Sequence, residues 1–297
     1  MKSKITERET RFLFNGEVLN KYNIRYYQCV ETGFIQTEPA YWLEEAYSSA
    51  ITPLDIGLLL RNEKLADATE LILQRNFNPD ASFLDYAGGY GTFTRIMRNR
   101  GYDFHHDDPF CENLFAKTFS LDDAGADRFE LITAFEVFEH FDDPVEDIKK
   151  IFNYGGSVLF STELIPQGVI LESTESWPYF VPDIGQHIAL YSIKSLQFLA
   201  QQMDLHFVSN GFNLHLFSKN PISEDLFSGL SQIYSGQIIR KQLCLHEKRT
   251  KIDWIKTAKT LFSPKNIVEA IKYISLPQIA PRESLLEKDT QSIKFRS

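Results

Sequence analysis

Residues 83–97 read FLDYAGGYGTFTRIM and place an apolar run, a turn of small residues and a helical pattern in direct succession. The apolar run is typical of a strand. Gly88, Gly89 and Gly91 allow backbone angles and a close ligand approach that a Cβ atom would block. A strand that enters a helix through such a turn exposes backbone N–H groups. The stretch therefore predicts a nucleotide-binding turn at the end of a strand.

The surrounding sequence alternates between strand and helix patterns, which predicts a parallel sheet with helical crossovers. Strands are expected at residues 82–87, 102–108, 129–135 and 156–162, and helices at 92–100, 143–152 and 192–203. Further on, Asn210-Gly211 stands between two alternating apolar runs and predicts a tight antiparallel hairpin within 205–219. The expected fold class is therefore α/β with a mixed sheet.

Two regions flank this core. Residues 21–36 are rich in β-branched and aromatic side chains and predict a short hairpin, and a helical pattern follows at about 52–75. After residue 219 the pattern changes to polar helical segments that end in a tail. We therefore expect three parts. They are a hairpin and helical extension (1–75), a ligand-binding domain (76–219) and a helical appendage with a flexible tail (220–297).

Composition restricts the partners and the compartment. The formal net charge of −9 argues against a protein that grips a phosphate backbone, so no nucleic-acid partner is expected. No run of about 18 apolar residues predicts a membrane span, and the charged N-terminus lacks the apolar core of a signal peptide. Cys29, Cys111 and Cys244 form no CxxC pair. This pattern suits reduced thiols in the cytoplasm and predicts no metal site.

The glycine turn matches the dinucleotide pattern G-x-G-x-x-G only in part. Gly89 and Gly91 fit its first two places, but Thr94 occupies the third. This departure weakens the hypothesis of a nicotinamide-dependent oxidoreductase, which we keep as an alternative function.

Acidic residues stand at the predicted ends of the next two strands. Asp108 follows Asp85 at roughly the interval of 20 residues at which a carboxylate meets a ribose, and Asp107 is its alternative. The strand at 129–135 runs directly into Glu136 and His140. Because ligands of open α/β sheets bind at the carboxyl ends of strands, these groups are expected to converge on one crevice.

Residues 83–218 resemble the class I S-adenosylmethionine-dependent methyltransferases. The similar pieces are FLDYAGGYG, DDPF, SLDD, FELITAFEVFEH and the closing VSNGFNLHLF hairpin. The resemblance implies a Rossmann-like sheet of about seven strands with the last one antiparallel. It also implies S-adenosylmethionine as the cofactor.

The same resemblance assigns the donor site residue by residue. It implies that the amino-acid portion of the donor is held by Asp85, Ala87, Gly88, Gly89, Tyr90 and Gly91. Asp108 would bind the ribose hydroxyls, beside Pro109 and Phe110 on the adenine side. Asp122, with Asp123 as the alternative, would accept from the adenine amino group, and Phe135 and Glu136 would lie beside the methionine. The family usually has glycine where this chain has Ala87.

Residues 26–47, YYQCVETGFIQTEPAYWLEEAY, resemble the N-terminal segment of a bacterial subgroup that includes sugar C-methyltransferases. That segment has a zinc site made of paired cysteines. Here Cys29 has no CxxC partner, since Thr32 stands in its place. The resemblance therefore implies that the metal has been lost and that the hairpin remains as scaffold.

His187, His140 and Glu136 are the candidate catalytic bases. A positioned histidine suits proton removal from a hydroxyl, but His187 can equally be a loop residue satisfied by the backbone. For His140 a structural role is favoured, and Glu136 is expected to touch the donor. Residues 172–185 and 40–47 are rich in aromatic side chains, which can form an acceptor lid or simply pack on the core.

These patterns together predict a cytoplasmic S-adenosylmethionine-dependent methyltransferase. The subgroup resemblance implies a small-molecule acceptor such as a sugar or sugar-nucleotide. Besides the oxidoreductase, the alternative is a non-catalytic module that retains the methyltransferase fold, because the zinc site is missing and the C-terminal region is long.

Overall fold

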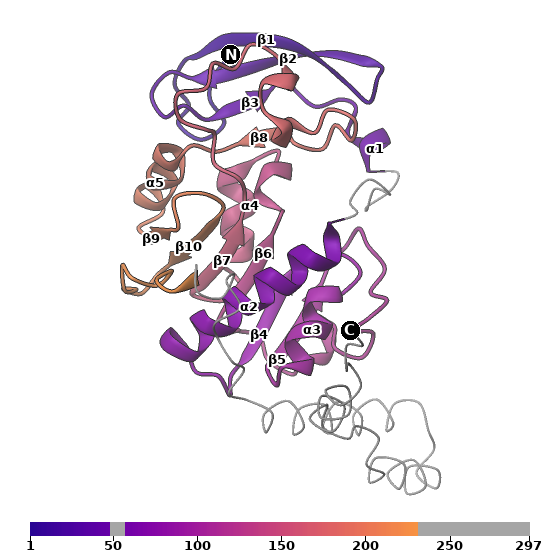
Figure 1. Cartoon of the computed structure of the whole chain (residues 1–297), viewed down its shortest axis with the longest axis vertical. Helices are drawn as coiled ribbons and strands as arrows, with labels where there is room; N and C mark the ends of the chain where they lie inside the picture. Colours follow the sequence, from indigo (N-terminus) through magenta and orange to yellow (C-terminus); the bar gives the residue numbers. More distant parts are fainter. Residues whose placement is uncertain (48–56, 231–297) are drawn as a thin grey trace, which may run out of the picture. The chain divides into compact units, whose positions relative to one another are not determined.

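The computed structural model describes residues 1–47 and 57–230. The strands of its larger sheet are β4 (Ser82–Tyr86), β5 (Asp103–Asp107), β6 (Ile132–Phe135), β7 (Ser157–Ser161), β9 (His206–Ser209) and β10 (Leu214–Ser218). Their order across the sheet is β5-β4-β6-β7-β10-β9 (Figure 1). The first four strands run parallel, and β10 runs antiparallel to both of its neighbours. The expected Rossmann-like mixed sheet with an antiparallel last strand is confirmed.

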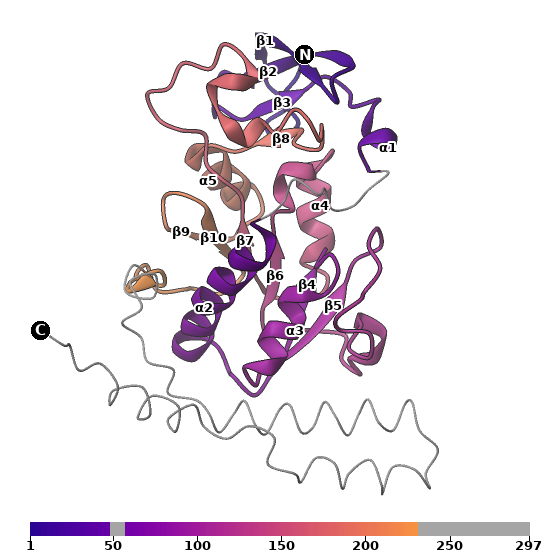
Figure 2. The same cartoon turned by 45° about the vertical axis from the view of Figure 1, so that its right-hand side comes forward.

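Helices cover both faces of this sheet (Figure 2). On one face lie α2 (Leu58–Asn76) and α3 (Thr92–Asn99), and on the other lie α4 (Pro144–Ile151) and α5 (Ile193–Gln202). Because both faces are covered, every residue of β7 and β10 is buried. Local signals place the helix starts: Pro144 occupies the first turn of α4, and Ser192 caps α5 by accepting from the backbone N–H of Ser195.

Within the described residues the larger sheet has six strands, close to the expected number of about seven. Beyond β5, the sheet edge has only a single parallel bridge between His106 and Ser120. The reason is local: the Ser120 and Asp123 side chains form a capping box that starts a 3-10 helix at Leu121–Asp123 directly after the bridge. The backbone therefore leaves the sheet edge before a strand can form.

The predicted hairpin at the end of the sheet is present as β9 and β10, but its connection is longer than two residues. Residues 210–213 form the loop, and the Asn210 side-chain oxygen accepts from the backbone N–H groups of Phe212, Asn213 and Leu214. Asn210 thus organises a four-residue loop in place of the expected two-residue turn.

The helical pattern at 52–75 is present as α2, while residues 52–56 lie outside the described part of the chain. Leu65 and Ile72 of α2 are buried, whereas Leu59 and Leu60 in its first turn are more than 60% exposed.

A second, smaller sheet contains β1 (Thr10–Val18), β2 (Tyr22–Cys29), β3 (Ile35–Thr37) and β8 (Ala189–Leu190), in that order. The hairpin predicted at 21–36 is confirmed as β2–β3, and the short helix α1 (Leu43–Ala46) follows it. β1 is not predicted by the sequence pattern, because a bulge between Phe12 and Phe14 interrupts its alternation. β8 is not predicted either, because it is only two residues long and comes from a distant part of the chain.

The backbone of Ile188, just before β8, connects the two sheets. Its N–H donates to the carbonyl of Glu139, which follows β6, at 2.9 Å. Its carbonyl accepts from the N–H of Thr37 at the end of β3, at 3.2 Å. The residue next to His187 is therefore held from both sides.

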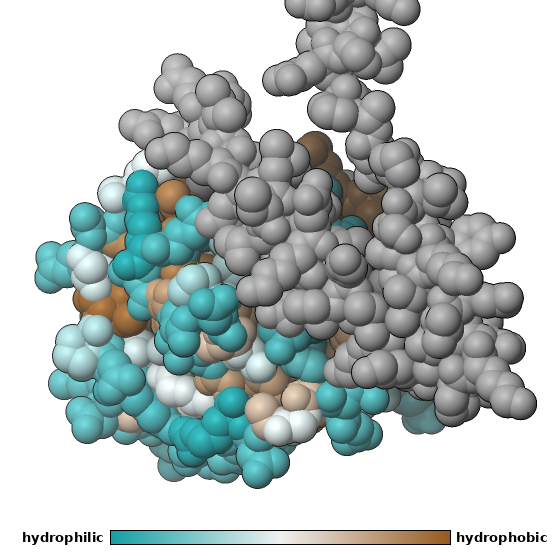
Figure 3. All heavy atoms as spheres, turned by 90° about the horizontal axis from the view of Figure 1, so that it is seen from below, coloured by the Kyte–Doolittle hydropathy of each residue, from teal (hydrophilic) through white to brown (hydrophobic). Residues whose placement is uncertain are grey.

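The helices in residues 1–47 and 57–230 include none that is long and apolar enough to cross a membrane. Where described residues form the face shown in Figure 3, hydrophilic and hydrophobic residues are interspersed. The predicted C-terminal helical segments and tail fall almost entirely in residues 231–297, outside the described residues.

Candidate active site

The glycine turn follows β4 and leads directly into α3. Ala87, Gly89 and Gly91 all have positive φ angles, of 54°, 57° and 80°. A Cβ atom on Gly88 would stand 2.5 Å from the carboxylate of Asp85, and one on Gly91 would stand 2.6 Å from the side chain of Asn113. The turn is thus compact and needs its glycines. Ala87 adopts a left-handed conformation that costs an L-residue about 1–2 kcal/mol.

Asp85 holds the turn from inside the protein. Its carboxylate is buried and accepts from the hydroxyls of Thr94 (2.8 Å) and Thr133 (3.1 Å). Burial raises the pKa of Asp85 to about 6, against the lowering effect of the Thr94 hydrogen bond. Nε2 of His106 donates to the carbonyl of Gly89 at 2.7 Å. Thr94, which breaks the dinucleotide pattern, is therefore part of the support that fixes the turn.

Asp108 lies against this turn, as the sequence predicts for a ribose-binding acid. Its Oδ2 accepts from the backbone N–H of Gly89 at 2.8 Å, and its Oδ1 accepts from those of Phe110 and Cys111. Asp107, the alternative, is half-buried, and its pKa is raised by burial and by its acidic neighbours Asp108 and Asp122. The structure therefore brings the ends of β4 and β5 together.

The residues expected around the adenine lie on the same side. Pro109 and Phe110 are exposed, and the ring of Phe110 stacks on Tyr47 at a centroid distance of 6.0 Å. Asp123 is occupied, since its Oδ2 accepts from the N–H and the hydroxyl of Ser120. Asp122 and Asp123 are both exposed, and they differ in that Asp123 is already held by Ser120. The backbone carbonyl of Tyr90 accepts from Leu114 and Phe115.

The third strand end delivers Glu136 in a left-handed conformation (φ 55°). Its backbone N–H donates to Oγ of Ser161 at 2.8 Å, and that hydroxyl donates back to its carboxylate at 2.5 Å. Burial and the charge of Glu139 raise the pKa of Glu136 to about 7, while the charges of Arg61 and His187 lower it. Phe135, one residue earlier, packs edge-on against Phe93 of α3.

Glu139, in the 3-10 turn Phe138–His140, is completely buried. Its Oε1 accepts from the hydroxyl of Tyr179 at 2.6 Å, whereas its Oε2 has no hydrogen-bond partner among the described residues. Burial raises the pKa of Glu139 to about 7, opposed by the Tyr179 hydrogen bond. A buried, half-satisfied carboxyl group is costly and marks this position as one that a ligand would complete.

The two candidate histidines lie together next to Glu139. The rings of His140 and His187 are 5.2 Å apart and nearly perpendicular. Nδ1 of His187 donates to the carbonyl of Tyr179 at 2.6 Å, which leaves Nε2 as the basic nitrogen. Nδ1 of His140 lies 3.1 Å from the hydroxyl of Tyr47. Burial lowers the pKa of His187. The pKa of His140 is lowered to about 3 by burial and by the charge of His187.

The two aromatic segments proposed as lids divide between core and site. Trp177 and Phe180 are buried in the core beneath the smaller sheet, and Trp42 is buried there too, donating to the carbonyl of Gly185. Tyr179 and Tyr47, in contrast, turn their hydroxyls to Glu139 and His140. Each segment therefore combines packing residues with one residue at the site.

Glu139 was not predicted from the sequence as a site residue, whereas Tyr179 belongs to the aromatic segment 172–185 that the sequence offers as an acceptor lid. A signal for Glu139 was present, because the EVFEH stretch contains a second acid directly before His140. Cys29, in the segment that resembles the zinc-binding subgroup, is a buried free thiol next to the Thr6 hydroxyl.

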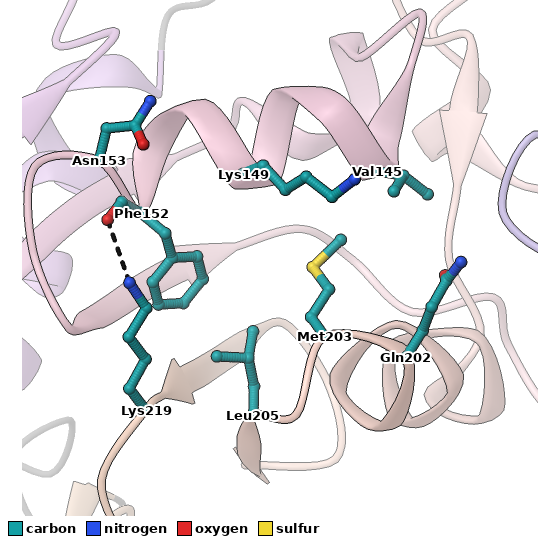
Figure 4. A pocket seen from close by; sticks show the side chains of 8 residues that line it. All are labelled: Val145, Lys149, Phe152, Asn153, Gln202, Met203, Leu205 and Lys219. Carbon is teal, nitrogen blue, oxygen red and sulfur yellow. Dashed lines mark hydrogen bonds between the residues drawn. The ribbon is translucent and has the colours of Figure 1, made fainter.

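A surface hollow of about 420 Å³ lies elsewhere (Figure 4). It is bounded by the end of α4, the end of α5 and Lys219, whose amino group donates to the carbonyl of Phe152. Lys219 follows β10 and Phe152 precedes β7, so the hollow is at the amino end of the parallel strands. Ligands of open α/β sheets bind at the opposite end, which is where the turn and the histidines lie.

Comparison with known proteins agrees with this geometry. A family model described as a methyltransferase domain matches residues 59–210, just over half of the chain. Curated protein sequences give no match.

Among solved structures the chain is similar to TnmH (13% identity, 60% of this chain and 61% of that chain, TM-score 0.43). It is also similar to an O-methyltransferase family 2 protein from Planctomyces limnophilus in complex with apigenin (16% identity, 59% of this chain and 65% of that chain, TM-score 0.38). A third similar structure is 1,6-didemethyltoxoflavin-N1-methyltransferase from Burkholderia thailandensis (12% identity, 67% of this chain and 96% of that chain, TM-score 0.42). The chain spans less than two thirds of the length of the first two, and likenesses this distant say nothing about its substrate.

Proposed function

The chain belongs to this methyltransferase-domain family, and from that premise we propose that it transfers a methyl group from S-adenosylmethionine to a small-molecule acceptor. The observation that most supports the donor is the 2.8 Å contact between Asp108 and the backbone of Gly89, which joins the acid to the turn. Family membership favours this function over the nicotinamide-dependent oxidoreductase. Thr94 stands where the dinucleotide pattern has its third glycine, and its hydroxyl instead donates to the carboxylate of Asp85.

The residues around the turn fit such a donor chemically. The turn from Ala87 to Gly91 presents a backbone almost without side chains, and Asp108 supplies a carboxylate that can accept from two ribose hydroxyls. Asp122 faces solvent and can accept from an adenine amino group, and exposed Phe110 offers an apolar face to the base. When bound, S-adenosylmethionine supplies a methyl group on an electrophilic sulfonium centre.

The acceptor side consists of Glu136, Glu139, His140 and His187. If the acceptor is a hydroxyl, its proton must leave as the methyl group arrives, and these buried groups can receive it. Nε2 of His187 and the carboxylate of Glu136 are the basic atoms available. Positioning of the acceptor by Tyr179 and Tyr47 would contribute the rest.

We take a sugar or sugar-nucleotide as the acceptor, on the resemblance of residues 26–47 to the subgroup with sugar C-methyltransferases. The β2–β3 hairpin and the lone thiol of Cys29 are compatible with a segment that has kept its fold without a zinc site. The division at residues 75 and 219, and the cytoplasmic location, remain predictions.

Calorimetric titration of the full chain with S-adenosylmethionine and, separately, with NAD tests the proposal. We expect binding of S-adenosylmethionine and none of NAD; binding of NAD alone would contradict the methyltransferase. Methyl transfer to a panel of hydroxylated sugars and sugar-nucleotides is then measured with labelled donor. Donor binding without transfer to any acceptor would instead indicate the non-catalytic module.

A further inference from the structure

Glu139, His140 and His187 each offer one ligand atom, and these atoms all lie within 4.8 Å of one another. We propose that they bind a divalent cation of the Mn²⁺ or Zn²⁺ type, and that this cation binds a hydroxyl group of the methyl acceptor. The cation site stands on its own geometry, whereas the role in acceptor binding rests on the proposed function. The sequence predicts no metal here because Glu139 and His140 lie far from His187 along the chain and form no paired cysteine or histidine spacing.

Glu139 supplies the first argument. A fully buried carboxylate needs partners for both oxygens, yet only Oε1 has one, the hydroxyl of Tyr179. Oε2 is buried and lacks a hydrogen-bond partner among residues 1–47 and 57–230. An unsatisfied buried oxygen next to two imidazole rings is the environment that a bound cation would stabilise.

His187 supplies the second argument. Metal-binding histidines commonly donate their other ring N–H to a carboxylate or a backbone carbonyl, which fixes the tautomer and the ring orientation. Nδ1 of His187 makes this bond to the carbonyl of Tyr179 at 2.6 Å. Tyr179 therefore orients two of the three proposed ligands, one through its backbone and one through its hydroxyl. Nε2 of His187 is left with its lone pair for a cation.

His140 completes the set from the residue next to Glu139. Its ring stands edge to face with that of His187 at 5.2 Å, and the hydroxyl of Tyr47 lies 3.1 Å from its Nδ1. Two atoms bound to one cation at about 2.1 Å are at most about 4.2 Å apart. The observed span of 4.8 Å is only slightly larger. Small side-chain rotations are enough to close it.

The ligand set indicates which cation fits and what it can do. Two imidazoles and one carboxylate suit transition-metal divalent cations better than Mg²⁺ or Ca²⁺, which prefer oxygen ligands alone. Three protein ligands leave positions open for a substrate oxygen. A hydroxyl bound to such a cation loses its proton more readily, which favours oxygen as the methyl acceptor.

The transfer step balances with Glu136 as proton acceptor. The acceptor oxygen forms a bond to the methyl carbon, and the carbon–sulfur bond of the donor breaks with its electron pair remaining on sulfur. The hydroxyl proton passes to the carboxylate of Glu136, which is held in place by the hydroxyl of Ser161 at 2.5 Å. His187 is then a cation ligand and no longer a base, so the two roles can be separated by experiment.

The test uses the full chain freed of metal with a chelator, titrated with Mn²⁺ and followed by electron paramagnetic resonance. We expect one Mn²⁺ per chain, with ¹⁴N modulation from imidazole ligands. Glu139→Gln, which keeps the shape of the side chain, should weaken Mn²⁺ binding at least about 100-fold. Glu112→Gln, a surface control whose carboxylate pairs only with Lys117 in the described structure, should leave it unchanged.

The ¹⁴N signal of the unaltered chain keeps the test decisive if Glu139→Gln folds poorly. Absence of any Mn²⁺ or Zn²⁺ binding at millimolar concentration, or Mn²⁺ binding without the nitrogen signal, would overturn the cation site. Equal Mn²⁺ affinity in a folded Glu139→Gln variant would do the same.

Donor binding separates this proposal from the proposed function. If the metal-free chain binds S-adenosylmethionine and methylates its acceptor at an unchanged rate, the cation proposal is wrong and the methyltransferase stands. If the chain binds Mn²⁺ with the nitrogen signal but does not bind S-adenosylmethionine, the proposed function fails while the cation site stands. Loss of methyl transfer on chelation, with recovery on addition of Mn²⁺, would support both.

Discussion

The proposed donor side and the proposed acceptor side of the site are built in different ways. The donor side, the turn Ala87–Gly91 with Asp108, comes from the ends of two adjacent strands, and its main contact joins a side chain to the backbone. The proposed acceptor side, Glu136 with Glu139, His140 and His187, gathers buried and half-buried ionisable side chains around a Glu139 oxygen that has no hydrogen-bond partner in the described structure.

This difference indicates a division of labour. A backbone turn tied by buried hydrogen bonds is already formed before a ligand arrives, so its ligand meets a preorganised surface. A cluster with perturbed pKa values and an unsatisfied oxygen is instead typical of groups that complete their bonding with a substrate or a cation. Substitutions on the two sides should therefore affect different measurements.

The largest effect is expected from His187→Ala on the acceptor side. Removing a base or a cation ligand should lower turnover roughly 10²–10⁴-fold, while the dissociation constant of the donor stays the same. Turnover is measured with labelled donor, and donor affinity by calorimetry. His206→Ala, on the exposed start of β9, is the matched control. Normal turnover in His187→Ala would show that His187 is a structural residue and would remove the expected difference between the two sides.

Asp108→Ala should act on the donor side. The loss of one or two charge-assisted hydrogen bonds, each on the order of 1.5–3 kcal/mol, should raise the donor dissociation constant roughly 10-fold or more. The freed N–H of Gly89 adds to this loss, since the turn also loses a partner. Asp127→Ala, at an exposed position, serves as the control in the same titration. An unchanged dissociation constant would show that the ribose acid has been misassigned.

His215 offers a reference outside both sides. It is buried between the carbonyl of Thr162 and the hydroxyl of Ser209, and burial lowers its pKa to about 4. Between about pH 6.5 and 4 the unfolded chain binds more protons at this residue than the native chain. As the pH is lowered through this range, His215 therefore decreases the free energy of unfolding by up to about 1.4 kcal/mol per pH unit.

Denaturant unfolding of wild type and His215→Gln across this range isolates the contribution, because other buried groups cancel in the difference. Glu136 and Glu139, whose pKa values are raised, act in the opposite direction over much of the same range. A difference between the two proteins that does not change with pH would show that His215 is not held neutral by burial.

The smallest effect is expected from Ala87→Gly in the donor turn. Glycine relieves the left-handed strain of Ala87 but makes the unfolded chain more flexible, so the net gain in the free energy of unfolding should be about 0.5–1 kcal/mol. Ala124→Gly, where φ is −66°, should lose stability instead. A loss at both positions would mean that the turn is not strained.

The donor side could be predicted because its information is local. Asp85, the glycines and Asp108 follow strands whose parallel pairing is itself readable from sequence, and parallel strands end at the same edge of a sheet. Even there, the inward role of Asp85 was missed, since a strand pattern does not say whether an acid faces a ligand or Thr94.

The acceptor side could not be predicted to the same degree. Glu139 and Tyr179 meet across 40 residues of chain that include irregular loops, and no periodic pattern encodes such a contact. The same applies to β8, whose two residues are too short to give a strand signal, and to the edge beyond β5, where the capping box at Ser120 replaced a strand.

The double attachment of Ile188 has a practical consequence for anyone who would trim this protein to the portion matched by the family, residues 59–210. That shortened version would lack Thr37, so the backbone of Ile188 would keep only its hydrogen bond to Glu139. The smaller sheet braces the backbone next to His187, so replacing residues 1–47 by another segment should displace His187 before it disturbs the glycine turn.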